Sequence, residues 1–378
     1  MPFLVYPPRP PAGPTDPPLI DPTPVPPVVS VPWRYVVTDT AGVAIGEPLA
    51  TGRQFTAGVS TTATAQFRVK SGTSLWSSIA AGDTMLKIYD STHALQYYGE
   101  IVTDELSATG QGGSAAFTSS DLSWRLSKRL TGKDFDGVGT EHLDKDSGEI
   151  IFDVLDEINA EQETGILPGN KDVFVNRTMT LLWKPVLQLL AELGAIESSY
   201  EWTLRYVDGT PPQVYLDLKT RVGDDVSGLV FFEYGTGKNN CQGYTRTRSM
   251  ETSATRVYGL GAGSTVVAVG YDASAETARR LEDQISFSDI STPSLVDALV
   301  AAHVAFRARP RKVVTFTPAP KLAPVYGADW SFGDFVTARA VVDGVWDTNG
   351  IARIWSVSVT LDELGNEVAV PRMEPDAG

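Results

Sequence analysis

Short runs of β-branched and aromatic residues, separated by glycine-rich turns, are the feature that most constrains the fold of this chain. Between residues 34 and 119 such runs lie at 34–38, 54–59, 64–70, 84–90, 96–106 and 114–119. The turns between them include 40–42, 80–83 and 110–113. Short strands at this regular spacing predict an antiparallel barrel or sandwich. We therefore expect a first β-barrel domain over residues 33–130.

Helical periodicity appears in the next part of the chain, which spans residues 131–228. The segments 148–162 and 181–193 repeat apolar residues at helical spacing, which predicts two amphipathic helices. Pro185 falls early in the second helix, where proline is tolerated, and Gly194 follows as a stop signal. A hairpin is expected over 200–219, and a polar loop over 131–147. Together these features predict a small α+β domain.

The last part of the chain, residues 229–378, returns to strand patterns. Runs of β type lie at 229–233, 241–250, 254–258, 312–318, 335–342, 351–361 and 366–370. The segments 274–286 and 294–306 have helical character, so we expect a second β-barrel with a helical insertion over 274–306. The predicted fold is mainly β with α+β insertions. It has two β-barrel domains and helical modules, preceded by an extended proline-rich arm.

The arm is residues 1–32, which hold 13 of the 25 prolines in the chain. Proline fixes φ and removes the amide donor, so extended polyproline II is the expected state rather than helix or central strand. Because such an arm has almost no internal hydrogen bonds, we expect it to lie on a neighbouring subunit. The residues expected to anchor it between subunits are Phe3, Leu4, Val5, Tyr6, Leu19, Ile20 and Trp33.

The net charge of the chain argues against a protein that binds nucleic acid through its phosphates. Lysine and arginine number 31 and aspartate and glutamate 46, which gives a net charge of −15. Phosphate binding needs a basic face. The balance suits a soluble particle component, or a channel wall along which DNA slides, and an ordinary soluble acidic protein fits it equally. No long apolar run or signal peptide is evident, so we expect assembly in the host cytoplasm.

Searching for reactive groups gives no catalytic, cofactor-binding or metal site. His93, His142 and His303 share no metal-ligand spacing and are expected on the surface or on a helix face. The single cysteine, Cys241, is expected to be unreactive beside a strand. Acidic pairs at 104–105, 224–225 and 362–363 all adjoin turns, where solvated carboxylates are the default. We therefore predict that the chain is not an enzyme and has no cofactor.

The eight tryptophans of the chain allow more than one role. Barrel cores, subunit interfaces and sugar-binding platforms all use this side chain. We expect Trp124, Trp183 and Trp355 in the core, and Trp33 and Trp330 at an interface or in a loop.

Five stretches of the sequence resemble the tail hub proteins of long-tailed bacteriophages, which are relatives of the baseplate hub of contractile tails. The stretches are RYVVTDTAGVAIGEPLATGRQFTAGVSTTATAQFRV, MLKIYDSTHALQYYGEIV, SSDLSWRLSKRL, the segment from ARRLEDQISFSD to YGADWSFGDFVTAR, and IARIWSVSVTLDELGNEVAVPRMEP. The likeness covers residues 33–375. It depends on the order of these features, since none of them is a rigid motif.

The resemblance implies a structural role at the tip of a virion tail. Three copies would form a hub ring, with two hub-type barrels per copy giving pseudo-six-fold symmetry. The implied partners are further copies of the chain, the distal tail ring protein, the tape measure protein and other tail-tip or receptor-binding proteins. DNA would pass only transiently through the lumen, and the host envelope would be met indirectly. Many hubs carry a lytic or receptor-binding extension, which we do not expect after Gly378.

Three other interpretations stay open at this point. One is a peptidoglycan hydrolase, whose activity would be lost on replacing Glu141, Glu149 or another acid, although no catalytic spacing is visible. A hexameric distal tail ring protein would be expected to have one barrel and to lack the second at 229–375. A carbohydrate-binding receptor-recognition module would need several exposed tryptophans on one face of the molecule.

Overall fold

The computed structural model describes residues 33–375, apart from 71, 74, 110–111, 134–138, 197–199, 252, 262–266, 273–278, 288–292, 309–310, 320–321 and 362–366. The predicted fold class, mainly β with α+β insertions, is confirmed. The helices in these residues are all too short or too polar to cross a membrane. The expected arm anchors Phe3, Leu4, Val5, Tyr6, Leu19 and Ile20 lie outside the described residues.

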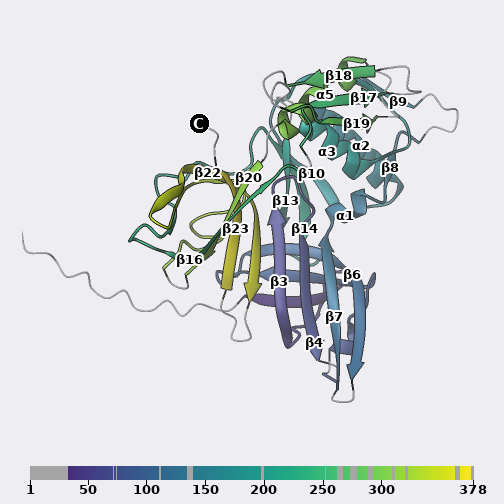
Figure 1. The fold of residues 1–378 in the computed structure, drawn as a ribbon. Coiled ribbons are helices and arrows are strands. Elements are labelled where there is room, and N and C mark those ends of the chain that lie inside the picture. The colour runs from purple at the N-terminus through teal and green to yellow at the C-terminus, as the bar shows by residue number, and fades with distance from the viewer. Residues whose placement is uncertain are drawn as a thin grey trace, which may run out of the picture. The chain divides into compact units, whose positions relative to one another are not determined.

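The first barrel forms because successive runs pair as antiparallel neighbours (Figure 1). In β4 every second residue is buried, so Ala65, Phe67 and Val69 point into the core while the polar residues between them face outward. Along the sheet the order is β3-β4-β7-β6-β5-β1-β2. The strands are β1 (Arg34–Asp39), β2 (Ala44–Gly46), β3 (Ala50–Gly58), β4 (Thr64–Lys70), β5 (Thr84–Tyr89), β6 (Leu95–Thr109) and β7 (Gly112–Asp121).

The second barrel is continuous with the first through one long strand, β22. Its residues Ser356 to Leu361 pair antiparallel with β3, from Gly58 to Arg53. Within the described residues, the two barrels therefore share one 13-stranded sheet and one hydrophobic core. The strands of the second barrel are β15 (Phe231–Tyr234), β16 (Cys241–Ser249), β20 (Arg311–Pro318), β21 (Phe335–Val342), β22 (Val345–Leu361) and β23 (Glu367–Pro375).

The α+β part is built around helix α2, which begins where the Asp146 carboxylate accepts hydrogen bonds from the amides of Gly148 and Glu149. The α+β elements are α1 (Ser123–Leu126), β8 (Leu130–Thr131), β9 (Thr140–Asp146), α2 (Ser147–Glu161), β10 (Ile166–Lys171), β11 (Asn176–Leu181), β12 (Lys184–Pro185), α3 (Val186–Ala195), β13 (Glu201–Val207) and β14 (Gln213–Lys219). The hairpin predicted over 200–219 is confirmed as β13–β14.

Three local predictions in this part are wrong. Residues 140–146, expected in a polar loop, form β9 because they pair with β11. Helix α3 begins only at Val186, since Leu181 ends a strand and Pro185 caps the helix in extended conformation. Gly194 lies inside the last turn of the helix rather than after it. In the first two cases strand pairing overrides the local pattern.

The insertion between β16 and β20 is only partly helical. It contains β17 (Arg256–Leu260), β18 (Val267–Tyr271), β19 (Glu282–Ser286) and α5 (Pro293–Arg307). The helix predicted over 274–286 is therefore wrong at 282–286, where β19 pairs parallel with β17. The insertion packs with the α+β core rather than with the second barrel, as Val257 and Val300 join the cluster that contains Leu190.

The tryptophan assignments are largely reversed. Trp33, expected as an inter-subunit anchor, is 3% exposed in the barrel core. Its indole nitrogen donates to Glu367 at 2.7 Å, and its ring centroid lies 5.2 Å from that of Phe55. Trp330 is also buried, whereas Trp183, expected in the core, is 42% exposed. Trp33 therefore fixes the start of β1 within its own chain.

Candidate functional site

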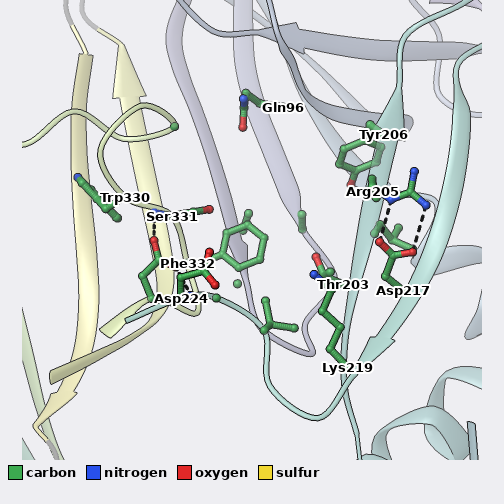
Figure 2. Close-up of a pocket in the computed structure, with 18 of the residues that line it drawn as sticks. Gln96, Thr203, Arg205, Tyr206, Asp217, Lys219, Asp224, Trp330, Ser331 and Phe332 are labelled. Atoms are coloured by element: carbon green, nitrogen blue, oxygen red, sulfur yellow. Dashed lines mark hydrogen bonds and ion pairs between the residues drawn. The ribbon is translucent and has the colours of Figure 1, made fainter. Parts of the chain in front are cut away.

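A polar pocket of about 650 Å³ lies where the two barrels meet the β13–β14 hairpin. We call it the junction pocket. Figure 2 shows its two walls, with Trp330, Ser331 and Phe332 on one side and Arg205 and Asp217 on the other. The walls come from segments more than one hundred residues apart, so only the folded chain creates this site.

An ion pair crosses the hairpin on one wall. The Arg205 Nε donates to Asp217 at 2.8 Å (Figure 2). The guanidinium also stacks 4.6 Å from the ring centroid of Tyr215. The Asp217 carboxylate also accepts the amide of Asn170 at 2.8 Å, so its oxygens are engaged from two directions. This wall therefore has no carboxylate left over for chemistry.

A bidentate clamp joins the α+β part to the second barrel. The Arg353 guanidinium on β22 donates to both oxygens of Glu201 on β13, at 2.6 and 2.5 Å. It also donates to the carbonyls of Val222 and Gly333, and stacks 4.4 Å from the ring centroid of Trp355. Both side chains are mostly buried. Each therefore depends on the other to remain paired away from water.

Next to the clamp, two glycines bring backbone segments into direct contact. Gly223 and Gly333 have φ values of +88° and +94°, and a Cβ on Gly223 would lie 2.1 Å from the carbonyl carbon of Gly333. Asp334 reinforces the contact by accepting the amides of Asp224 and Ser331, each at 2.7 Å. The turn at 333–334 thus contacts the 221–226 loop directly.

Asp121 closes the pocket at the end of β7. Its carboxyl accepts the amides of Ala63 and Ser123, at 2.7 and 2.9 Å, and the Ser123 hydroxyl at 2.5 Å. Burial raises the pKa of Asp121 to about 6, although these hydrogen bonds act in the opposite direction. The Asp121 side chain is 2% exposed, and its hydrogen bonds connect the β3–β4 turn to the start of α1.

These contacts join the α+β part to the two barrels. The charged groups described above are held by ion pairs or by backbone amides, which fixes their positions. Sequence reasoning missed Glu201, Arg353 and Asp121, because the partners of each lie far away along the chain. The pair Glu201 and Arg353, for example, is separated by 152 positions.

The residues that the sequence singled out do not gather here. Cys241 begins β16, is 4% exposed, and burial raises the pKa of its thiol to about 12. His93 is exposed and His303 is half-buried on α5. His142, expected in a surface loop, is instead 8% exposed on β9, and burial lowers its pKa. Among the described residues, no group of three or more His, Cys, Asp or Glu side chains could hold a metal ion.

No family model and no curated protein matches the sequence of this chain. Solved structures do resemble its fold. A tail protein from Neisseria meningitidis MC58 has a TM-score of 0.61 at 11% identity, covering 92% of this chain and 97% of that one. The 43 kDa tail protein of prophage MuSo2 from Shewanella oneidensis has a TM-score of 0.57 at 13% identity, covering 90% and 97%.

A third similar structure comes from a secretion system. It is an Escherichia coli component of the type VI secretion system, described as structurally similar to the bacteriophage T4 tail proteins gp27 and gp5. Its TM-score is 0.51 at 8% identity, and the match covers 90% of this chain and 77% of that one. The chain thus has the fold of phage tail proteins, which confirms the hub-like resemblance at the level of the fold.

Proposed function

We propose that this chain is a structural protein of a phage tail tip. In this proposal three copies form a hub ring that joins the distal tail ring to the tip. The ring lines the channel through which the tape measure protein and then DNA pass. The supporting fold likeness covers nearly the whole described chain. The role is structural rather than catalytic.

The observation that carries the proposal is the continuity of the two barrels. Strand β22 belongs to the second barrel and pairs with β3 of the first, and Phe55, Phe117, Phe232 and Phe316 lie in one shared core. A rigid two-barrel unit supplies two similar wall segments per copy. Three copies would then present six segments to a six-fold tube. A distal tail ring protein would need only one barrel, so the second barrel favours the hub.

The junction pocket and the charge fit the same role. The ion pair of Glu201 and Arg353 fixes the α+β part against the barrels. Each copy would therefore keep its shape when the ring assembles. A net charge of −15 suits a channel wall that DNA passes without sticking. Among the tryptophans that the structure describes, only Trp183 and Trp346 are strongly exposed, which gives little support to a sugar-binding platform.

The test is cryo-electron microscopy of the tail end of the particle, focused on the ring that contains this chain. We expect three copies, each contributing two barrels to the wall of the lumen. Six copies with one barrel each facing the lumen would assign the chain to the distal ring. Absence of the chain from any tail would overturn the proposal.

A further inference from the structure

An exposed apolar knuckle lies at the tip of the β21–β22 hairpin, away from the junction pocket. Val345 is 69% exposed, Trp346 54% and Val342 41%. Their positions follow from the register, in which Val342 pairs with Val345 and Val341 with Trp346 across the tight turn at Asp343 and Gly344. Tryptophan is enriched in binding hot spots, and the two exposed valines extend the apolar surface beside it.

The hairpin tip is held firmly from its other side. The residue after Trp346, Asp347, accepts the Tyr244 hydroxyl and an Arg246 N–H, and its carbonyl accepts Lys312 Nζ at 2.5 Å. Burial acts to raise the pKa of Asp347, but the Tyr244 hydrogen bond and the two cations outweigh it and lower the pKa. The carboxylate thus stays charged and bonded, so Trp346 is presented on a rigid strand.

Beside the indole lies an open cavity of about 380 Å³. Its lining residues are Glu233, Thr236, Lys238, Arg339, Trp346 and Asn349. The one carboxylate, Glu233, is already paired with Arg339 at 3.0 Å. In contrast, Lys238, the Asn349 side chain and the Trp346 indole N–H have no partner among the described residues. The cavity therefore offers a free cation at Lys238, a net positive charge and an aromatic face, whereas its one carboxylate is already paired.

This chemistry selects a ligand that brings negative charge and apolar rings. An acidic, proline-rich segment in polyproline II conformation has carboxylate and carbonyl acceptors, and it packs its rings against aromatic side chains. A neutral saccharide would leave the Lys238 ammonium without a counter-charge. The lining thus favours an acidic, proline-rich segment over a neutral sugar.

The chain itself contains a segment that matches. Residues 16–22 read Asp-Pro-Pro-Leu-Ile-Asp-Pro. They combine prolines for the indole, two acids for the free cation of Lys238, and the apolar pair Leu19 and Ile20 for the valines of the knuckle. The end of this segment lies eleven positions before Trp33, a reach of about 35 Å at the rise of polyproline II. The segment 7–11 is also rich in proline but carries Arg9, which the free cation of the cavity disfavours.

We propose that the Trp346 cavity binds residues 16–22 of a second copy of this chain. The proposal deepens the hub proposal, on which it rests, by naming the surface that receives the arm. It assigns Trp346 as the central contact, Lys238 and Asn349 as donors to the segment, and the two aspartates as its charge anchors.

The test uses the full-length chain in two differently tagged versions, purified together as the oligomer. One version carries Thr15→Cys and the other Val345→Cys, and a short bis-maleimide is added. The native Cys241 is buried and stays unreactive. We expect cross-linked pairs that carry both tags, and at least about tenfold fewer of them when Trp346→Ala is added. The matched control is Tyr271→Ala, which removes an aromatic side chain of similar exposure, 57%, and should leave the yield unchanged.

Three results would overturn the proposal. The tagged pair could form no more often than a pair made with Leu143→Cys, an exposed position on the α+β part. Trp346→Ala could leave the yield unchanged. Cross-links could join only copies that carry the same engineered cysteine. Failure of the hub proposal looks different, because the ring would then be missing from tails while purified copies still cross-link through Trp346.

Discussion

The junction pocket and the Trp346 cavity are both polar hollows, but they differ in how their central charged groups are held. Asp217, which lines the junction pocket, and Glu201 and Arg353, which form the clamp next to it, are paired and largely buried. In the Trp346 cavity the donors Lys238 and Asn349 are exposed and unpaired among the described residues. Paired buried charges stabilise the folded chain, whereas unpaired exposed donors next to an indole are available to bind a ligand. The first site should thus govern stability and the second should govern assembly.

Arg353→Ala should give the largest loss of stability. The substitution leaves Glu201 buried without its partner, which costs about 3–5 kcal/mol for a broken buried pair. Chemical denaturation followed by circular dichroism measures the change. Val345→Ala, on the exposed knuckle, is the matched control and should change the stability by less than about 0.5 kcal/mol. Equal stabilities of the two variants would mean that the clamp does not hold the joint.

Asp121 should make stability fall as the pH rises. Its pKa is about 6 in the folded chain against an ordinary value of 3.8, so the folded state binds the proton more tightly than the unfolded state. The contribution is complete below about pH 4 and is lost as the pH passes through about 6, roughly 3 kcal/mol in all. Urea denaturation at pH 4 and pH 7 should show this fall in the wild type but not in Asp121→Asn.

Asp172 provides the control of opposite sign for that measurement. Hydrogen bonds from the Thr220 amide and hydroxyl lower the pKa of Asp172, so its contribution is present at neutral pH and is lost as the pH falls. Asp172→Asn should therefore reduce stability at pH 7 more than at pH 4. A wild-type profile unaffected by Asp121→Asn would show that the buried carboxyl does not control this joint.

Gly223→Ala should destabilise the chain by about 2 kcal/mol, less than the loss of the clamp. The position has φ +88°, and the new Cβ would meet the backbone of Gly333. Gly344, with φ +78° at the knuckle, has open space around it, so Gly344→Ala isolates the cost of the backbone conformation alone. Thermal melts of the two variants separate the cost of the steric contact from the cost of the backbone conformation. An equal decrease in melting temperature would argue against close contact at the junction.

Trp346→Ala should have the smallest effect on stability. The indole is more than half exposed and makes no hydrogen bond among the described residues, so we expect a change under about 0.5 kcal/mol. The same variant should lose most of the cross-linking between copies. A large loss of stability instead would place Trp346 with the structural residues and remove the contrast between the two sites.

Local patterns determine much of the fold. The run 64–70 and the run 335–342 match β4 and β21 at both ends, and the helix predicted over 148–162 is α2 shifted by one residue. Such segments carry a period of two or of 3.6 in their own residues, so the sequence alone identifies them. The proline-rich composition of residues 1–32 is equally local, and by itself it predicts an extended arm.

Only the tertiary structure decided which segments meet. The pairing of β22 with β3, the packing of the insertion on the α+β core, the burial of Trp33 and the clamp of Glu201 with Arg353 all join residues far apart along the chain. The free donors around Trp346 were equally invisible, because a side chain is unpaired only relative to its neighbours in space. The sequence of a segment specifies its hydrophobic period, and hence whether it forms a strand or a helix. Which distant residues it contacts depends on how the whole chain packs its hydrophobic cores.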